Sequence, residues 1–249
     1  MILYKYMRAD YALEAIRSGL IKVSTLADVN DPDEFMPSFR NLSIMPTHNG
    51  NIFAIPDAKD QFRRGWCSEH GFISLSENWD NAAMWGLYGD KCRGIALRFE
   101  ARTDGVVFPV KYNASRAIFT YDDIQKMDNN EKGRCFYGQK GQMWLFEQEW
   151  RRLVHCDSWI SHKSSNGKMI YLWKPDTTMI LTGVLLGPQC EANMGDVRVA
   201  MKERVHPDIT YGTEIMLLQS DLETYALRIG YCDRYENGAW SIGVAPHAM

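Results

Sequence analysis

The chain has 249 residues, of which 45% are hydrophobic and 12% aromatic, and these values indicate a folded domain with a sizeable core and exclude a disordered chain. A formal net charge of −3 excludes the strong positive field that recruits nucleic acid. The first residues are too polar for a signal peptide, and no apolar run is long enough to span a membrane. We therefore expect a cytoplasmic protein with reduced cysteines.

The hydrophobic pattern predicts short strands interrupted by a few helices. Strands are expected at 2–6, 20–25, 71–76, 93–100, 106–112, 149–155, twice within 170–187, and at 214–219 and 226–232. Helices are expected at 10–19, 78–89 and 193–206, and partly within 113–143, whereas residues 41–60 look irregular. Since we find no internal repeat and no linker, we predict one α+β domain over residues 1–249, with a strand-rich core and peripheral helices.

The six cysteines and six histidines form no clear metal-binding motif. No CxxC pair occurs, but Cys67-x-x-His70 and His155-Cys156 each place two potential ligands close together. Zinc sites usually have tighter patterning than two unlinked pairs. The sequence therefore predicts no metal site.

Two acidic residues, Glu147 and Glu149, lie two positions apart in "FEQEW". If this segment is a strand, both carboxylates face the same side. Neighbouring carboxylates repel each other and one pKa should rise, which suits general acid–base work or the stabilisation of a developing cation. The alternative is an exposed strand edge with ion pairs to Arg151 or Arg152.

Three polar residues interrupt strands that are otherwise apolar or aromatic. Lys5 lies between Tyr4 and Tyr6, so it must reach solvent or meet an anion, unless it is an ordinary edge-strand lysine. Alternation places Ser74 and Ser76 of "GFISLS" on one face of a strand. No nucleophile elbow surrounds these serines, which argues against a serine hydrolase. Their hydroxyls could hold a ribose or an amide, or face solvent.

An acidic turn follows the second predicted strand. It contains Asn30, Asp31 and Glu34 around a proline, a composition typical of turns. This segment is either a structural turn or a loop that faces a substrate. No P-loop, GxGxxG, HExxH or EF-hand motif occurs anywhere in the sequence.

The order of these pieces resembles the ADP-ribosyltransferase superfamily. Its members show an arginine or histidine on a first strand, and its arginine-type members add a "GF-x-S-x-S"-like middle strand and an E/Q-x-E strand. Here "LYKY", with lysine in place of arginine or histidine, "GFISLS" and "EQE" stand in that order. The chain also resembles a widespread bacterial family of unknown function. That resemblance rests on blocks at Leu3–Tyr6, Val29–Glu34, Met84–Gly94 and Trp144–Arg151.

The resemblance implies a split sheet that binds NAD as a substrate. Glu149 would be the catalytic glutamate and Glu147 its companion. Residues near NAD would be Lys5, where the superfamily has Arg or His, its neighbours Tyr4 and Tyr6, Ser74 at the ribose with Ser76 in support, and Trp85 or Tyr88 stacked on the nicotinamide. The acidic turn with Asn30, Asp31 and Glu34 would be a loop that faces the substrate.

Three functions remain open at this point. The first is an enzyme that transfers ADP-ribose from NAD to a protein or nucleic-acid acceptor, or hydrolyses NAD, in a bacterial toxin or phage-defence setting. The second is a non-catalytic module of the same fold that binds a nucleotide or a macromolecule. A phosphodiesterase ranks last, because the sequence has no acidic metal cluster and no histidine pair.

Overall fold

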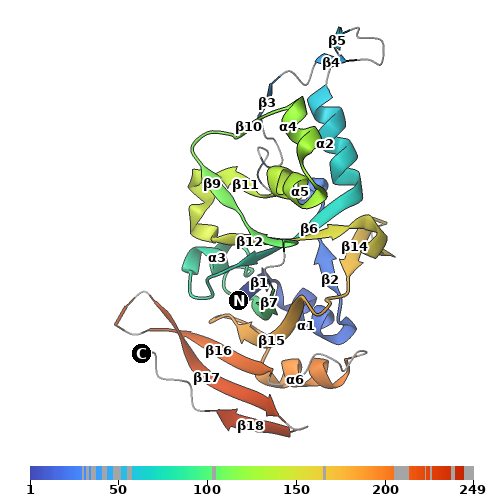
Figure 1. Ribbon diagram of the computed structural model, residues 1–249. Helices are drawn as coiled ribbons and strands as arrows, with labels where there is room; N and C mark the ends of the chain where they lie inside the picture. Colours follow the sequence, from blue (N-terminus) through green and yellow to red (C-terminus); the bar gives the residue numbers. More distant parts are fainter. Residues whose placement is uncertain are drawn as a thin grey trace.

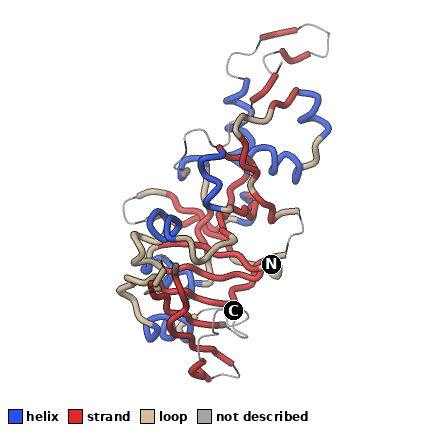
Figure 2. Tube along the Cα trace, turned by 90° about the vertical axis from the view of Figure 1, so that its left-hand side faces the viewer, coloured by secondary structure: helices blue, strands red, loops and turns tan. Residues whose placement is uncertain are grey.

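The computed structural model describes residues 1–29, 31, 34, 38–40, 44–46, 52–54, 58–102, 105–164, 167–204, 213–221, 223–224, 226–236 and 239–243. Nine of the described strands form one mixed sheet in the order β18-β17-β16-β15-β7-β1-β6-β12-β8, and four smaller sheets surround it. The described helices lie at the periphery of the strands (Figures 1 and 2). The chain is thus an α+β domain, as the sequence predicts.

The elements have the following bounds. The strands are β1 (Ile2–Met7), β2 (Ile21–Val23), β3 (Ser38–Arg40), β4 (Ile44–Pro46), β5 (Ile52–Ala54), β6 (His70–Ser76), β7 (Ile95–Ala101), β8 (Val107–Pro109), β9 (Lys111–Asn113), β10 (Ile118–Thr120), β11 (Gln139–Gly141), β12 (Glu149–His155), β13 (Ile160–Lys163), β14 (Met169–Trp173), β15 (Met179–Leu186), β16 (Glu214–Ser220), β17 (Leu227–Glu236) and β18 (Ala239–Gly243). The α-helices are α1 (Ala9–Ser18), α2 (Ala58–Glu69), α3 (Ala82–Leu87), α4 (Tyr121–Lys126), α5 (Asn129–Tyr137) and α6 (Met194–Lys202), and the 3-10 helices are η1 (Leu26–Asp28), η2 (Gln142–Glu147) and η3 (Cys156–Ser158).

The two faces of the large sheet are covered differently. On one face, apolar side chains of α1 and α6, such as Ile16 and Val197, pack on the alternate residues of β1, β6 and β7. On the other face, one cluster forms around Trp85 of α3 and a separate one around Phe136 of α5. The part of this second face that lies between the two clusters carries the polar residues of β6 and β12.

β1 and β6 meet in the sheet and then separate. Their described register contains one pair, Tyr4 with Ser76. Further along β6, Phe72 pairs instead with Ser24, just after β2, through backbone hydrogen bonds of 2.8 and 2.9 Å. Gly71 permits this close approach, because a Cβ there would lie 2.4 Å from a side-chain atom of β2. The edge of β6 is therefore open between these two contacts.

Lys5 reaches into this opening. On β1 it pairs with Leu97 of β7, so its side chain leaves the strand on the face of the α1–α6 core. Its Nζ lies 3.5 Å from the carbonyl oxygen of Ser74, at the position where the β1–β6 ladder has stopped. The ammonium of Lys5 thus contacts a backbone carbonyl of β6 that would accept a hydrogen bond from β1 if the β1–β6 ladder continued.

Several sequence expectations need correction. The helix α2 was not expected. The segment 106–112 forms two short strands, β8 and β9, instead of one, and short strands occur within 41–60. The six cysteines, all of which are among the described residues, form no disulfide. Within the described ranges, no helix is long and apolar enough to cross a membrane.

Trp85 belongs to the core. Its side chain is 0% exposed, its Nε1 donates a 2.6 Å hydrogen bond to the carbonyl of Trp79, and its ring packs edge-on against Tyr6 with centroids 4.9 Å apart. The expectation that Trp85 faces a ligand is therefore wrong, since no part of the ring is open to a cavity.

We expect Trp85→Ala to lower the free energy of unfolding by about 3–5 kcal/mol, because it empties a large, fully buried site. Leu87→Ala, on the same helix but 62% exposed, is the matched control and should change stability by less than about 0.5 kcal/mol. Urea denaturation followed by far-UV circular dichroism measures both changes. Equal losses for the two variants would contradict the burial of Trp85.

Candidate functional site

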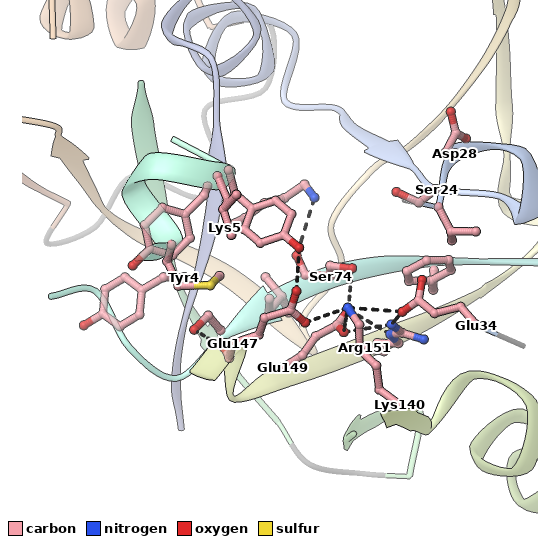
Figure 3. A pocket seen from close by; sticks show the side chains of 18 residues that line it. Tyr4, Lys5, Ser24, Asp28, Glu34, Ser74, Lys140, Glu147, Glu149 and Arg151 are labelled. Carbon is pink, nitrogen blue, oxygen red and sulfur yellow. Dashed lines mark hydrogen bonds and ion pairs between the residues drawn. The ribbon is translucent and has the colours of Figure 1, made fainter. Parts of the chain in front are cut away.

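A cavity of about 410 Å³ lies where β1 and β6 separate, a volume within the usual range of small-molecule sites. Side chains from β1, β6, α3 and β12 point into it (Figure 3). The lining residues are Tyr4, Lys5, Tyr6, Ser24, Asp28, Val29, Glu34, Phe72, Ser74, Leu75, Ser76, Met84, Leu87, Tyr88, Lys140, Glu147, Glu149 and Arg151. The cavity thus brings together residues that are far apart in the sequence.

Glu149 is held by three side chains. Arg151 binds it with two nitrogens, Nε to Oε1 at 2.8 Å and Nη2 to Oε2 at 2.7 Å. The hydroxyl of Ser74 donates to Oε1 at 2.6 Å, and the Nζ of Lys140 lies 3.5 Å from Oε2. A fork of two charge-assisted hydrogen bonds fixes both position and orientation, so this carboxylate is preorganised.

Glu147 is held by a different set. Its Oε1 accepts a 2.5 Å hydrogen bond from the hydroxyl of Tyr88, and its Oε2 accepts a 2.6 Å bond from Lys140. Its backbone carbonyl accepts a 2.7 Å hydrogen bond from the hydroxyl of Ser76. The two serines of β6 thus have distinct partners, because Ser74 binds the carboxylate of Glu149 and Ser76 holds the backbone of Glu147.

The two glutamates do not lie on one strand. Glu147 ends the 3-10 helix η2, Glu149 begins β12, and Gln148 between them has φ 42° and ψ 53°. Such left-handed backbone is uncommon for a residue other than glycine and often marks functional sites. The turn is further fixed by the backbone N–H of Glu149, which donates to the hydroxyl of Tyr112 at 2.7 Å. The carboxylates therefore share the cavity through this turn and not through strand alternation.

Lys140, Arg151 and Glu34 complete a buried network of charges. Lys140 lies 3.2 Å from Glu34 and Arg151 makes an ion pair with the same carboxylate. Arg151 also donates to the carbonyl of Tyr137 at 2.8 Å, and its side chain is 1% exposed. Burying ions is costly unless they are paired and hydrogen-bonded, and here each charge has several partners.

The network shifts the pKa values of the two glutamates in opposite directions. Burial raises the pKa of Glu147, and the neighbouring Lys140 and Tyr88 only partly oppose it. Burial acts in the same direction on Glu149, but the charge and hydrogen bonds of Arg151, followed by Lys140, hold its pKa below the usual range. Two carboxylates with separated pKa values can take different roles, one as a permanent anion and the other as a proton acceptor.

Lys5 stands apart from this network. Within the described ranges, no carboxylate lies within ion-pair distance of its Nζ. Burial, with a smaller effect of Lys22, lowers the pKa of Lys5 to about 8, and the more distant Glu149 only partly opposes this. The cavity therefore contains an ammonium group whose charge is available to an anionic ligand.

The structure brings together most of the residues predicted from the sequence. Nine of them line the cavity: Tyr4, Lys5, Tyr6, Glu34, Ser74, Ser76, Tyr88, Glu147 and Glu149. Trp85 does not, for the reason given above. Asp31 is buried beside the turn and does not line the cavity, whereas Asn30 lies outside the described residues.

Two residues of the network were not predicted. Arg151 was considered only as a partner on an exposed edge, although its spacing from Glu149 in an alternating strand places both on one face. Lys140 belongs to "GQKGQ", which has no hydrophobic period that would reveal its direction. Ser24 and Asp28 also line the cavity, and no motif or hydrophobic period in the sequence pointed to them.

Comparisons with protein-family models, curated proteins and solved structures gave no match.

The Arg151 ion pairs should be important for stability. We expect Arg151→Met to lower the free energy of unfolding by about 3–5 kcal/mol at pH 7, because it leaves Glu149 and Glu34 buried with one cation fewer. Arg17→Met breaks an exposed ion pair with Glu203 and should cost about 0–1 kcal/mol. Urea denaturation gives both values, and a loss for Arg151→Met no larger than that of the control would contradict the buried network.

Proposed function

We propose that this chain is an ADP-ribosyltransferase-like enzyme that uses NAD as its substrate and transfers ADP-ribose to a protein or nucleic-acid acceptor, or to water. The observation that carries the proposal is the convergence of Lys5, Ser74 and Glu149, from three different strands, on one cavity at the opening of the sheet. These are the residues that the sequence resemblance assigns to the NAD site. The Glu147–Glu149 pair with separated pKa values is consistent with the same chemistry.

Glu149 has the properties needed to stabilise a developing cation. In the proposed reaction the bond between the ribose C1′ and the nicotinamide nitrogen breaks, and its electron pair leaves with nicotinamide. Positive charge then develops on the ribose, and a carboxylate fixed in advance stabilises it more than it stabilises the ground state. The fork to Arg151 keeps Glu149 ionised and immobile.

Glu147 is placed to complete the transfer. The acceptor or a water molecule attacks the ribose C1′ and loses a proton. A raised pKa brings Glu147 closer to neutral pH, which suits a group that accepts this proton. Tyr88, which donates to Glu147 from α3, also lines the cavity and offers a ring to the nicotinamide.

One observation favours a second candidate. Both oxygens of Glu149 are already hydrogen-bonded within the described part of the chain, as in a structural ion pair. A binding module of the same fold would hold NAD or another nucleotide in this cavity without turning it over. The two candidates differ in whether wild-type protein releases nicotinamide.

The catalytic proposal predicts a hierarchy between the two glutamates. Glu149→Gln should lower the rate of nicotinamide release by about 10²–10³ with little change in NAD affinity, since it removes one preorganised anion. Glu147→Gln should lower NAD hydrolysis less. Glu131→Gln, on the exposed surface of α5, is the control and should match wild type.

Nicotinamide release measures the rates, calorimetry the affinities, and melting curves the folding of each variant. Equal activity of wild type and Glu149→Gln, at measurable turnover, would remove the catalytic assignment. NAD binding without any nicotinamide release from wild type would establish the binding module instead.

The charge of Lys5 should make anion binding dependent on pH. The amine is protonated below its pKa of about 8 and neutral above it, so ADP-ribose should bind up to about tenfold more weakly at pH 9 than at pH 7. Lys5→Arg should remove most of this dependence, because the guanidinium stays charged over the whole range. Calorimetric titrations with ADP-ribose test this expectation, and the same pH profile in both proteins would exclude Lys5 as the cause.

A further inference from the structure

A second group of chemically active side chains lies at the other end of β6 and β12. His70 begins β6, His155 ends β12, and the two residues are directly paired in the register. Their rings are 5.0 Å apart between centroids and nearly perpendicular. His70 is four residues from Ser74, so about 13 Å of strand separates this corner from the cavity. The β6–β12 pairing thus joins the two pairs that were unlinked in the sequence, Cys67-x-x-His70 and His155-Cys156.

Three consecutive residues at this corner place their ligand atoms together. A nitrogen of His155, the sulfur of Cys156 and a carboxylate oxygen of Asp157 all lie within 4.8 Å of one another. The His155 Nδ1 is 3.2 Å from Asp157 Oδ2, and the Cys156 Sγ is 3.9 Å from Asp157 Oδ1. The same Nδ1 accepts a 3.3 Å hydrogen bond from the backbone N–H of Asp157, which a metal bound at this nitrogen would replace. Tetrahedral zinc with bonds of about 2.0–2.3 Å places neighbouring ligand atoms about 3.3–3.6 Å apart. Only small movements would therefore bring these atoms to coordination distance.

His70 contributes a ring that is already oriented. It is 6% exposed, it stacks on Trp66 with centroids 4.1 Å apart, and its Nδ1 lies 3.2 Å from the Trp66 carbonyl. A carbonyl can only accept, so Nδ1 carries the proton and Nε2 keeps its lone pair. Histidine ligands of metals typically donate their second ring nitrogen to a carbonyl or carboxylate in this way.

We propose that His155, Cys156 and Asp157, completed by His70, form a binding site for a borderline-soft divalent cation, with Zn²⁺ as the preferred ion. The ring of His70 has to move toward the other three to bind, because its nitrogens do not belong to the group of atoms within 4.8 Å of one another. Two imidazoles, one thiolate and one carboxylate are the mixture of donors that zinc accepts, whereas Mg²⁺ and Ca²⁺ require oxygen ligands. On binding, the thiol of Cys156 loses its proton to solvent and the sulfur donates its electron pair to the metal. Cys67 is buried, and its sulfur does not belong to the group of ligand atoms that lie together at this corner.

This site is independent of the proposed transferase reaction. It ties the start of β6 to the turn that follows β12, and both strands carry residues of the cavity. Because a metal that binds only the folded state stabilises it by mass action, the bound ion should strengthen the pairing of these strands.

The test is a titration of the full chain, first stripped with a chelator, with Co²⁺ and then with Zn²⁺ in competition. Wild type should show the intense thiolate-to-cobalt absorption in the near ultraviolet, release about one proton per Zn²⁺, and melt at a higher temperature with Zn²⁺ than without. Cys156→Ser should lose the thiolate absorption. His155→Gln and His70→Gln should each weaken Zn²⁺ binding at least tenfold.

Cys190→Ser replaces a half-buried cysteine outside this corner and should behave like wild type. His155 is largely exposed, so His155→Gln keeps the test valid even where His70→Gln loses stability. A wild type without thiolate absorption, a Cys156→Ser variant that keeps it, or unchanged Zn²⁺ affinity in His155→Gln or in folded His70→Gln would each overturn the proposal.

Discussion

The buried fork between Arg151 and Glu149 is the interaction on which the geometry of the cavity depends. Both residues belong to β12 and point to the same face, opposite Ser74 and Ser76 of β6. Buried ions need ion-pair and hydrogen-bond partners to offset the loss of solvation. Glu34 and Lys140 belong to the same network, since Glu34 makes ion pairs with both Arg151 and Lys140. Residues from four separate segments are thereby fixed around one carboxylate.

The same constraint divides the cavity into two electrostatic regions. On the side of β12, two cations and three carboxylates form ion pairs with one another. On the side of β1, Lys5 contacts a backbone carbonyl and, within the described residues, no carboxylate at ion-pair distance. A ligand with an anionic part and a part that becomes positive during reaction would match both regions, and NAD has this character. The match supports the proposed function through charge, in addition to the order of the motifs.

The sequence predicted the parts of the site that lie on regular strands. Alternation in β6 correctly placed Ser74 and Ser76 on one face, because Ile73 and Leu75 on the other face are needed for the core. The sequence predicted that Glu147 and Glu149 lie side by side through alternation on one strand. They do lie in the same cavity, but the left-handed backbone of Gln148 turns the chain between them, and only Glu149 belongs to a strand.

The remaining parts could not be read from local patterns. Lys140 lies in a strand of three residues, where no hydrophobic period indicates the direction of its side chain. The prediction for Trp85 was wrong because the sequence of a short helix does not distinguish an aromatic residue of the core from one that contacts a ligand. The partners of Arg151 depend on long-range packing, which a single sequence does not contain.

The single described pair that joins β1 to β6 also has a mechanical consequence. The more backbone hydrogen bonds join two parts of a sheet, the harder it is to separate them. Here six strands lie on one side of the β1–β6 junction and three on the other, and the described ladder between them is one pair long. The bridge between Ser24 and Phe72 is a second backbone contact near this junction. Local opening of a protein starts where few bonds have to be lost. A pivot of the two parts about Tyr4 and Ser76 would break few backbone bonds and would widen the cavity, and the apolar core shared by β1, β6 and β7 is the contact that opposes it.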